Sequence, residues 1–195
     1  IRGSYYAFES YSGLRGHKGY ALAYGLTGLF IPASLSVVLT ISEGGFVTMN
    51  EIGPQLDYDA LFTSPLTWSI VILSVTAVLY ISSVFLTWYA NKAGDGAASQ
   101  LMRKYALIWS APLIISAIGI IIELRRTENW HYENMLSISW LFILSAILFF
   151  VTTWLIWKKR NYGLAVIIMI LQFATAFFAY GISHYPYLLY PYLTI

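Results

Sequence analysis

The chain has 195 residues, of which 58% are hydrophobic and only 10% are charged. A soluble domain carries about 25% charged residues, and a chain of this length could not bury so much apolar surface. The absence of cysteine excludes disulfides, thiolate metal sites and thiol nucleophiles. The net charge of +2 is too small to indicate nucleic-acid binding, so we expect no nucleic-acid partner. The composition therefore predicts an integral membrane protein.

Five stretches without charged residues predict the membrane spans. Each approaches or exceeds the ~18–20 apolar residues needed to cross a hydrocarbon core. Because that core holds no water, the backbone must satisfy its own hydrogen bonds, and the stretches should be helices. The predicted fold class is therefore an all-α integral membrane protein with five transmembrane helices, within residues 19–42, 60–91, 105–122, 134–157 and 161–183. Ser64 followed by Pro65 is a start signal for the second helix.

The charges between the stretches predict the orientation. Nine of the eleven basic residues precede the first stretch or follow the second and fourth: Arg2, Arg15, Lys18, Lys92, Arg103, Lys104, Lys158, Lys159 and Arg160. Cytoplasmic loops of membrane proteins are enriched in Lys and Arg. We expect the chain to begin on the cytoplasmic side and to end outside, and we expect both ends to be cuts in a longer chain.

The segment of residues 43–62 carries four acidic residues and no basic one: Glu43, Glu51, Asp57 and Asp59. One interpretation is an antechamber for cations or protons on the outer face. The other is a solvated loop that also fixes the topology. We favour the solvated loop, because the segment has no recognisable metal-ligand spacing.

A second group of charges follows the third stretch, comprising Glu123, Arg125, Arg126 and Glu128. It could bind a lipid or quinone headgroup at the outer interface. It could also be a local ion-pair cluster at a helix end, which is the interpretation we favour, since exposed ion pairs are common and contribute little.

Histidines offer few candidate cofactor ligands. His17, His131 and His184 all fall in loops or at helix ends, and no methionine lies at a convincing matched depth for a His/Met haem pair. His184 could be an axial haem ligand or a proton relay, but we favour an interfacial residue. We assign no catalytic, cofactor-binding or metal-binding residue, and we expect no cofactor bound by this chain.

One alternative class of protein is half of a secondary transporter. Pro32 and Pro112 are expected to kink the first and third helices, as in the broken or moving helices of transporters. Transporters usually place a polar or charged group near the midplane. Here the spans hold no charged residue, and Gln172 and Thr175 are the most polar groups at that depth.

Several short motifs resemble subunit II of cytochrome bd-type quinol oxidases. Residues 1–9 resemble the aromatic-Arg-Gly/Pro...Phe-Glu/Asp segment after that subunit's third helix, although Ile1 stands where an aromatic residue is common. Ser64-Pro65 resembles the start of its fifth helix. Residues 181–187 resemble the Gly-x-x-x-aromatic-Pro-aromatic turn that ends its eighth helix. The order and spacing of these motifs run nearly end to end.

The resemblance implies helices four to eight of a nine-helix subunit. Residues 1–18 would be a cytoplasmic segment, 19–42 a helix of the first bundle, 43–63 an outer acidic loop, and 64–195 a four-helix second bundle. Arg2 and Glu9 would form a structural ion pair at the cytoplasmic rim.

The same resemblance implies a role in a respiratory complex of a bacterial or archaeal cytoplasmic membrane. The complex would oxidise membrane quinol and reduce oxygen to water. Its b-type and d-type haems would lie in the partner subunit I, and this chain would be a scaffold that helps to define proton or oxygen access. Membrane lipids, quinone and a small third, single-helix subunit are further candidate partners.

Overall fold

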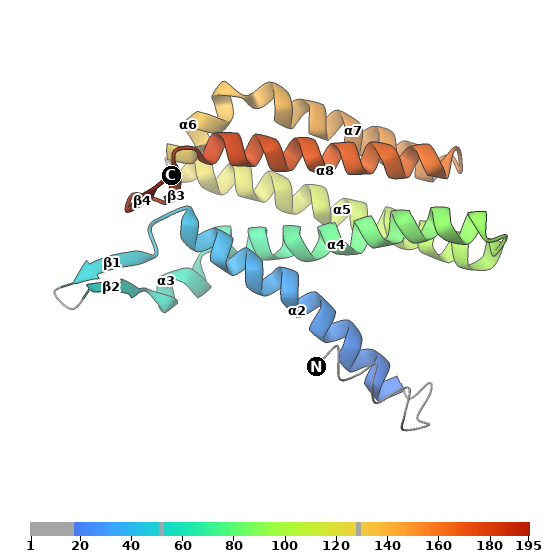
Figure 1. The fold of residues 1–195 in the computed structure, drawn as a ribbon, viewed down its shortest axis with the longest axis horizontal. Helices are drawn as coiled ribbons and strands as arrows, with labels where there is room; N and C mark the ends of the chain where they lie inside the picture. The colour runs from blue at the N-terminus through green and yellow to red at the C-terminus, as the bar shows by residue number, and fades with distance from the viewer. Residues whose placement is uncertain (1–17, 51–52, 128–129) are drawn as a thin grey trace.

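The computed structural model describes residues 18–50, 53–127 and 130–195. Within these ranges, five helices are long and apolar enough to cross a membrane (Figure 1): α2 (Lys18–Ser42), α4 (Pro65–Lys92), α5 (Gly96–Arg126), α7 (Ser139–Trp157) and α8 (Tyr162–His184). They correspond to the five charge-free stretches, so the predicted helical membrane fold is confirmed.

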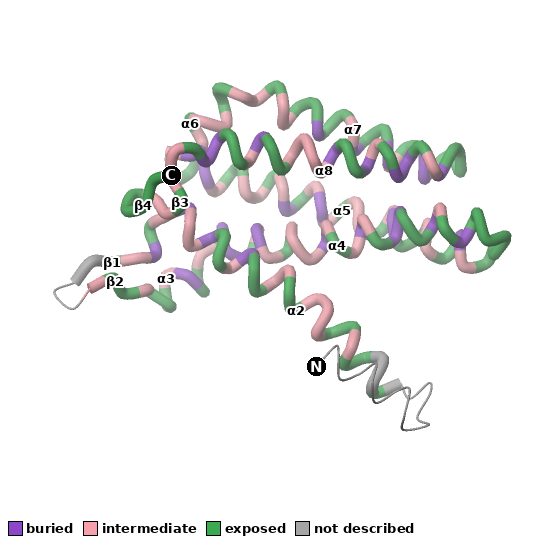
Figure 2. The backbone as a smooth tube through the Cα atoms, in the orientation of Figure 1, coloured by how far each residue is buried: buried purple, intermediate pink, exposed green. Residues whose placement is uncertain are grey.

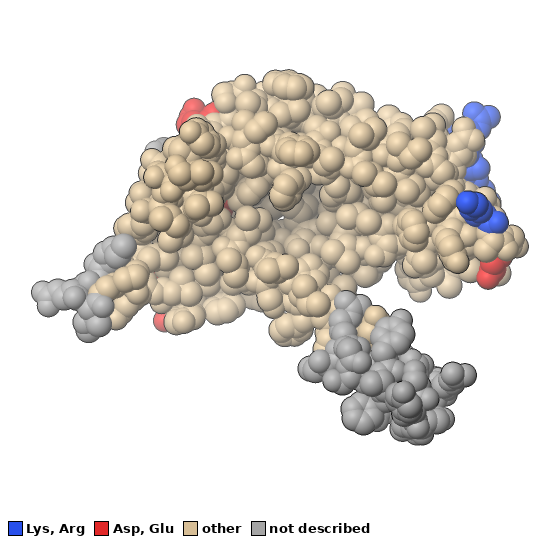
Figure 3. Space-filling model, in the orientation of Figure 1, with Lys and Arg blue, Asp and Glu red and all other residues tan. Residues whose placement is uncertain are grey.

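Short elements gather at one end of these helices (Figure 1). They are the antiparallel pair β1 (Val47–Asn50) and β2 (Gly53–Leu56), the helices α3 (Tyr58–Thr63) and α6 (Trp130–Ser137), and the antiparallel pair β3 (Tyr187–Leu189) and β4 (Leu193–Thr194). We call this the Glu43 end. At the opposite end, which we call the basic end, α4 turns into α5 and α7 turns into α8, and Lys and Arg side chains gather there (Figure 3).

The long helices pack as neighbours in sequence and across the molecule. The pairs α4–α5 and α7–α8 are in contact, α4 also contacts α8, α5 contacts α7, and α2 lies against α4. Tyr80, Val84, Phe149 and Met169 belong to the shared core. Exposed positions recur along all five long helices (Figure 2), and many of them are large hydrophobic residues. Lipid would cover such a surface in a membrane. The predicted division into two bundles stays a prediction.

Two boundaries differ from the prediction. The third span was expected within residues 105–122, but α5 begins at Gly96 because the Asp95 side chain caps it, accepting the Ala98 N–H at 2.9 Å. Arg103 and Lys104 are therefore helical and do not lie in a loop. The fourth span is two helices, α6 and α7, interrupted at Ile138, whose φ of −117° and ψ of 24° are not helical. Pro65 is the first residue of α4, as predicted.

Candidate functional site at the Glu43 end

Glu43 follows the last residue of α2, and its side chain is buried. Its exposed fraction is only 2%, so the interpretation of the whole 43–62 segment as solvated is wrong at this residue. A buried carboxylate is costly unless charged or hydrogen-bonding groups surround it. The Tyr180 hydroxyl donates to Oε1 at 2.7 Å, and His131 Nδ1 lies 2.8 Å from Oε2. The protein thus replaces the water that the carboxylate loses.

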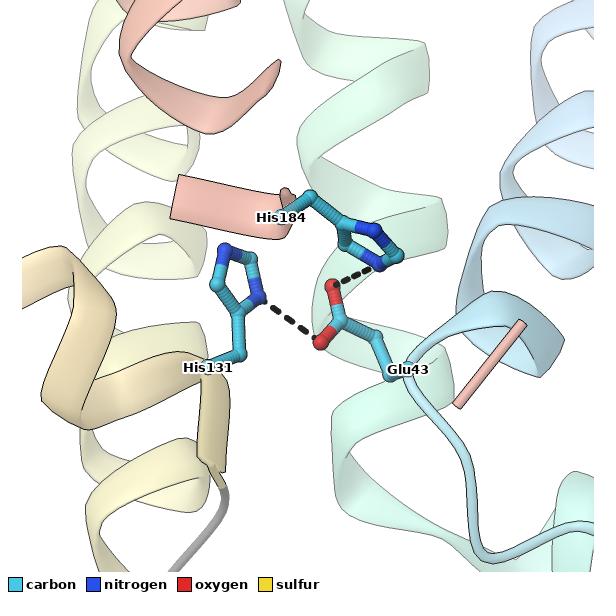
Figure 4. Close-up of side chains that lie close together, drawn as sticks. All are labelled: Glu43, His131 and His184. Atoms are coloured by element: carbon cyan, nitrogen blue, oxygen red, sulfur yellow. Dashed lines mark hydrogen bonds and ion pairs between the residues drawn. The ribbon is translucent and has the colours of Figure 1, made fainter. Parts of the chain in front are cut away.

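His131 and His184 approach the same carboxylate from α6 and from the end of α8 (Figure 4). Their exposed fractions are 0% and 8%. His184 Nε2 lies 3.9 Å from Glu43 Oε1, and the two imidazole rings meet edge to face with centroids 5.1 Å apart. His184 was expected to be an interfacial residue, which stays a prediction, and the structure buries it within this group at the end of α8. We call Glu43, His131, Tyr180, Ser183 and His184 the Glu43 cluster.

Hydrogen bonds on the side away from Glu43 hold both histidine rings. The Ser183 hydroxyl donates to the Tyr180 carbonyl at 2.8 Å, so its oxygen is free to accept from His131 Nε2, 2.6 Å away. His184 Nδ1 lies 2.7 Å from the Tyr187 carbonyl oxygen, which can only accept. Each ring is therefore held by a hydrogen bond on the side away from Glu43, through an N–H in His184, and its other nitrogen faces the carboxylate.

Aromatic rings and a glycine enclose the cluster. Trp130 stacks on His131 and Tyr190, with centroids 5.3 Å and 5.0 Å away, and contacts His184 edge-on. Gly44 has φ +91°, and a Cβ at that position would lie 2.8 Å from the Tyr190 ring. Glycine at position 44 thus lets the chain after Glu43 turn beneath the C-terminal segment.

The cluster does not fit a haem. His131 and His184 contact each other directly, so there is no plane for a macrocycle between their rings. Met169 is a buried core residue of α8, whereas His184 ends that helix and His131 lies at the Glu43 end. Neither histidine therefore lies at the same depth in the membrane as Met169. The two histidines together, or either of them with Met169, therefore do not form a haem ligand pair.

The other predicted site residues lie apart from the cluster or outside the described residues. Glu123 and Arg126 form an ion pair of 3.7 Å at the end of α5, as the ion-pair interpretation expected, and Arg125 is exposed. Arg2, Glu9 and Glu128 lie outside the described residues.

The sequence analysis missed the cluster because it considered each residue separately. Glu43, His131 and His184 come from three distant segments, and spacing along the chain gives no metal-ligand motif. The predicted topology nevertheless places all three residues at the same end of the helices. Combining the topology with the histidine positions could have indicated that they meet.

The architecture and the sequence together identify the class and the family of this chain. Five apolar helices capped by a buried polar cluster define a multi-pass membrane protein. The sequence model of the family "Cytochrome bd terminal oxidase subunit II" matches residues 1–195, and the chain belongs to that family.

Two similar proteins extend the comparison. The chain is 30% identical over 185 residues to a Bacillus subtilis (strain 168) protein named "Putative cytochrome bd menaquinol oxidase subunit II", covering 88% of this chain and 52% of that protein. It is 58% identical, with a TM-score of 0.81, to a chain in the structure of bd oxidase from Geobacillus thermodenitrificans, covering 99% of this chain and 58% of that one. The chain thus spans little more than half the length of these relatives.

Proposed function

We propose that the chain is part of subunit II of a bd-type quinol oxidase, a complex that oxidises membrane quinol and reduces oxygen to water. The observation that carries this proposal is the family match along all 195 residues. The name of the Bacillus subtilis relative makes menaquinol the first quinol to test. The oxidase activity belongs to the assembled complex, and no residue of this chain is proposed to be catalytic.

The proposed role of this chain is that of a scaffold for the haem-bearing subunit I. The b-type and d-type haems would supply the electron-transfer and oxygen chemistry of the complex. The exposed apolar surfaces of α2, α7 and α8 suit burial against lipid or other helices. A small third, single-helix subunit is a further candidate partner on these surfaces.

The basic end is proposed to face the cytoplasm of a bacterium or archaeon. Lys92, Arg103, Lys158, Lys159 and Arg160 all belong to this end. The Lys92 ammonium lies 5.4 Å from the centroid of the Trp88 ring, and that of Lys158 lies 4.7 Å from the Trp157 ring. Tryptophan beside lysine is typical of a membrane interface, and the excess of basic residues indicates its cytoplasmic side.

The experiment that tests the oxidase proposal uses the full-length subunit co-expressed with the proposed subunit I. The purified complex is expected to show b- and d-type haem absorption in a fixed ratio to this subunit, and to consume oxygen with a menaquinol analogue. A haem-free preparation that moves solute across vesicles would instead support the transporter alternative, which the family match does not favour. Complexes with Arg2→Ala and Glu9→Ala test the proposed ion pair through assembly and activity.

A further inference from the structure

Glu43, His131 and His184 present three metal-binding groups to one point. A carboxylate oxygen and one nitrogen of each imidazole lie within 4.8 Å of one another, and all three residues are buried. They come from the end of α2, from α6 and from the end of α8 (Figure 4). We propose that they form a binding site for a divalent transition-metal ion, with Zn²⁺ as the representative ion.

The first argument is the direction of the ring nitrogens. His131 lies between two partners, because Nδ1 is 2.8 Å from Glu43 Oε2 and Nε2 is 2.6 Å from the Ser183 hydroxyl, which can donate or accept. His184 Nδ1 donates to the Tyr187 carbonyl, so in a neutral ring Nε2 carries the lone pair, and it lies 3.5 Å from the Ser42 hydroxyl and 3.9 Å from Glu43 Oε1. Each ring nitrogen that faces the carboxylate needs a positive species between the two, either a proton or a metal ion. A metal ion bound by all three groups satisfies this requirement.

The second argument is the outer hydrogen bonds. A histidine that binds a metal almost always donates its other ring N–H to a carboxylate, a backbone carbonyl or a similar acceptor, which fixes the tautomer and the ring orientation. His184 has a backbone carbonyl in this position and His131 has the Ser183 hydroxyl. The Tyr180 hydroxyl also orients the carboxylate by donating to Oε1 at 2.7 Å.

The distances and the ligand types indicate the class of metal. Zn²⁺ binds nitrogen and oxygen at about 2.0–2.2 Å, which places neighbouring ligand atoms about 3.0–3.5 Å apart. The 2.8 Å and 3.9 Å separations involve the two different carboxylate oxygens, and the three ligand atoms lie within 4.8 Å of one another, so the side chains would have to rotate toward a bound ion. Two imidazoles and one carboxylate suit zinc and similar transition metals, whereas Mg²⁺ and Ca²⁺ prefer oxygen ligands alone. A bound ion would join three segments that are remote in sequence.

The test measures zinc on the purified complex that contains the full-length subunit. The complex is treated with a chelator, titrated with Zn²⁺, desalted and analysed for zinc by mass spectrometry. One Zn²⁺ per subunit is expected in the wild type. Zinc is counted per subunit, so the result does not depend on whether the complex carries haem. Failure of the oxidase proposal is therefore distinguishable from failure of the metal site.

Variants then locate the ion. Glu43→Gln and His184→Ala are expected to weaken zinc binding at least ~100-fold, and Ser183→Ala about 10–100-fold, the range observed when an outer hydrogen-bond partner is removed. Glu133→Gln is the matched control, because Glu133 is an exposed carboxylate on α6 near His131, and its affinity should equal that of the wild type. Equal zinc retention by the wild type, Glu43→Gln and His184→Ala would overturn the proposal.

Wild-type protein provides a second measurement that requires no variant to fold. X-ray absorption at the zinc edge should show nitrogen and oxygen ligands at about 2.0–2.1 Å, together with the outer-shell scattering of two imidazoles. A spectrum with only oxygen ligands, or with sulfur ligands, would place the zinc elsewhere and overturn the proposal.

Discussion

His131 and Glu43 are 88 positions apart in sequence, yet His131 Nδ1 lies 2.8 Å from Glu43 Oε2. Neither residue lies in the interior of a long helix. Glu43 follows α2, and His131 is the second residue of the short helix α6. Their contact therefore joins the end of α2 to the segment that precedes α7, and the Glu43 cluster connects both to the end of α8.

The first prediction concerns the buried carboxylate in the metal-free complex. Glu43→Gln replaces the carboxylate that accepts the Tyr180 hydroxyl and faces two histidines. Removing one partner of a buried ionic group costs about 3–5 kcal/mol, so the melting temperature should fall by about 6 °C or more. Thermal unfolding in the presence of a chelator measures this change.

Glu123→Gln is the control for that experiment. Glu123 pairs with Arg126 at 3.7 Å, and the Arg126 side chain is largely exposed. Exposed ion pairs contribute little, so the melting temperature should change by no more than about 1–2 °C. Equal effects of the two substitutions would show that the burial of Glu43 has no particular importance.

The spans could be predicted from the sequence because the hydrocarbon core of the bilayer limits which residues each span can hold. Charged residues are excluded from the hydrocarbon core, so charge-free stretches locate α2, α4, α5, α7 and α8. Helix ends were harder to predict, because they lie beyond that core. The Asp95 cap extends α5 past Lys104, and the backbone at Ile138 separates α6 from α7. The family resemblance rested on short motifs, and the family match over residues 1–195 supports it.

The Glu43 cluster could not be predicted from local sequence. Glu43 is followed by two glycines in an acidic segment, a pattern typical of an exposed turn. Its burial depends on α6 and on the C-terminal segment that folds over it, where the Tyr190 N–H donates to the Ser42 carbonyl at 3.2 Å. Such contacts depend on the three-dimensional arrangement of remote segments and leave no periodic pattern.

The second prediction concerns the turn beneath that segment. Gly44→Ala should destabilise the complex in two ways. Its φ of +91° is unfavourable for alanine, and the new Cβ would lie 2.8 Å from the Tyr190 ring and 2.9 Å from its carbonyl oxygen. A left-handed residue costs about 1–2 kcal/mol, and overpacking adds about 1–3 kcal/mol.

Gly45→Ala separates the two causes. Gly45 has φ +84°, but a Cβ there would have no neighbour within 4 Å. This variant should show the backbone cost alone, so its melting temperature should lie between those of the wild type and Gly44→Ala. If Gly45→Ala were as unstable as Gly44→Ala, the contact with Tyr190 would be irrelevant.

The third prediction concerns the hydrogen bond between α4 and α7. Tyr80 is buried in the core, and its hydroxyl lies 3.1 Å from the Thr153 hydroxyl. Tyr80→Phe and Thr153→Val should each reduce the free energy of unfolding by about 0.5–1.5 kcal/mol. The double variant should lose less than the sum, since both substitutions remove the same bond. Additive losses would show that the two hydroxyls do not interact in the complex.

The fourth prediction concerns orientation, and the absence of cysteine from this chain makes it direct to test. Glu133→Cys reports on α6 at the Glu43 end, and Lys158→Cys reports on the turn between α7 and α8 at the basic end. Both native side chains are exposed, so both cysteines should react in solution.

With any cysteines elsewhere in the full-length protein replaced, a membrane-impermeant maleimide should label Glu133→Cys in intact cells, and Lys158→Cys only after permeabilisation. The excess of Lys and Arg at the basic end is the physical reason, because such residues are retained on the cytoplasmic side. The reverse labelling pattern would invert the proposed topology and place the Glu43 cluster on the cytoplasmic side.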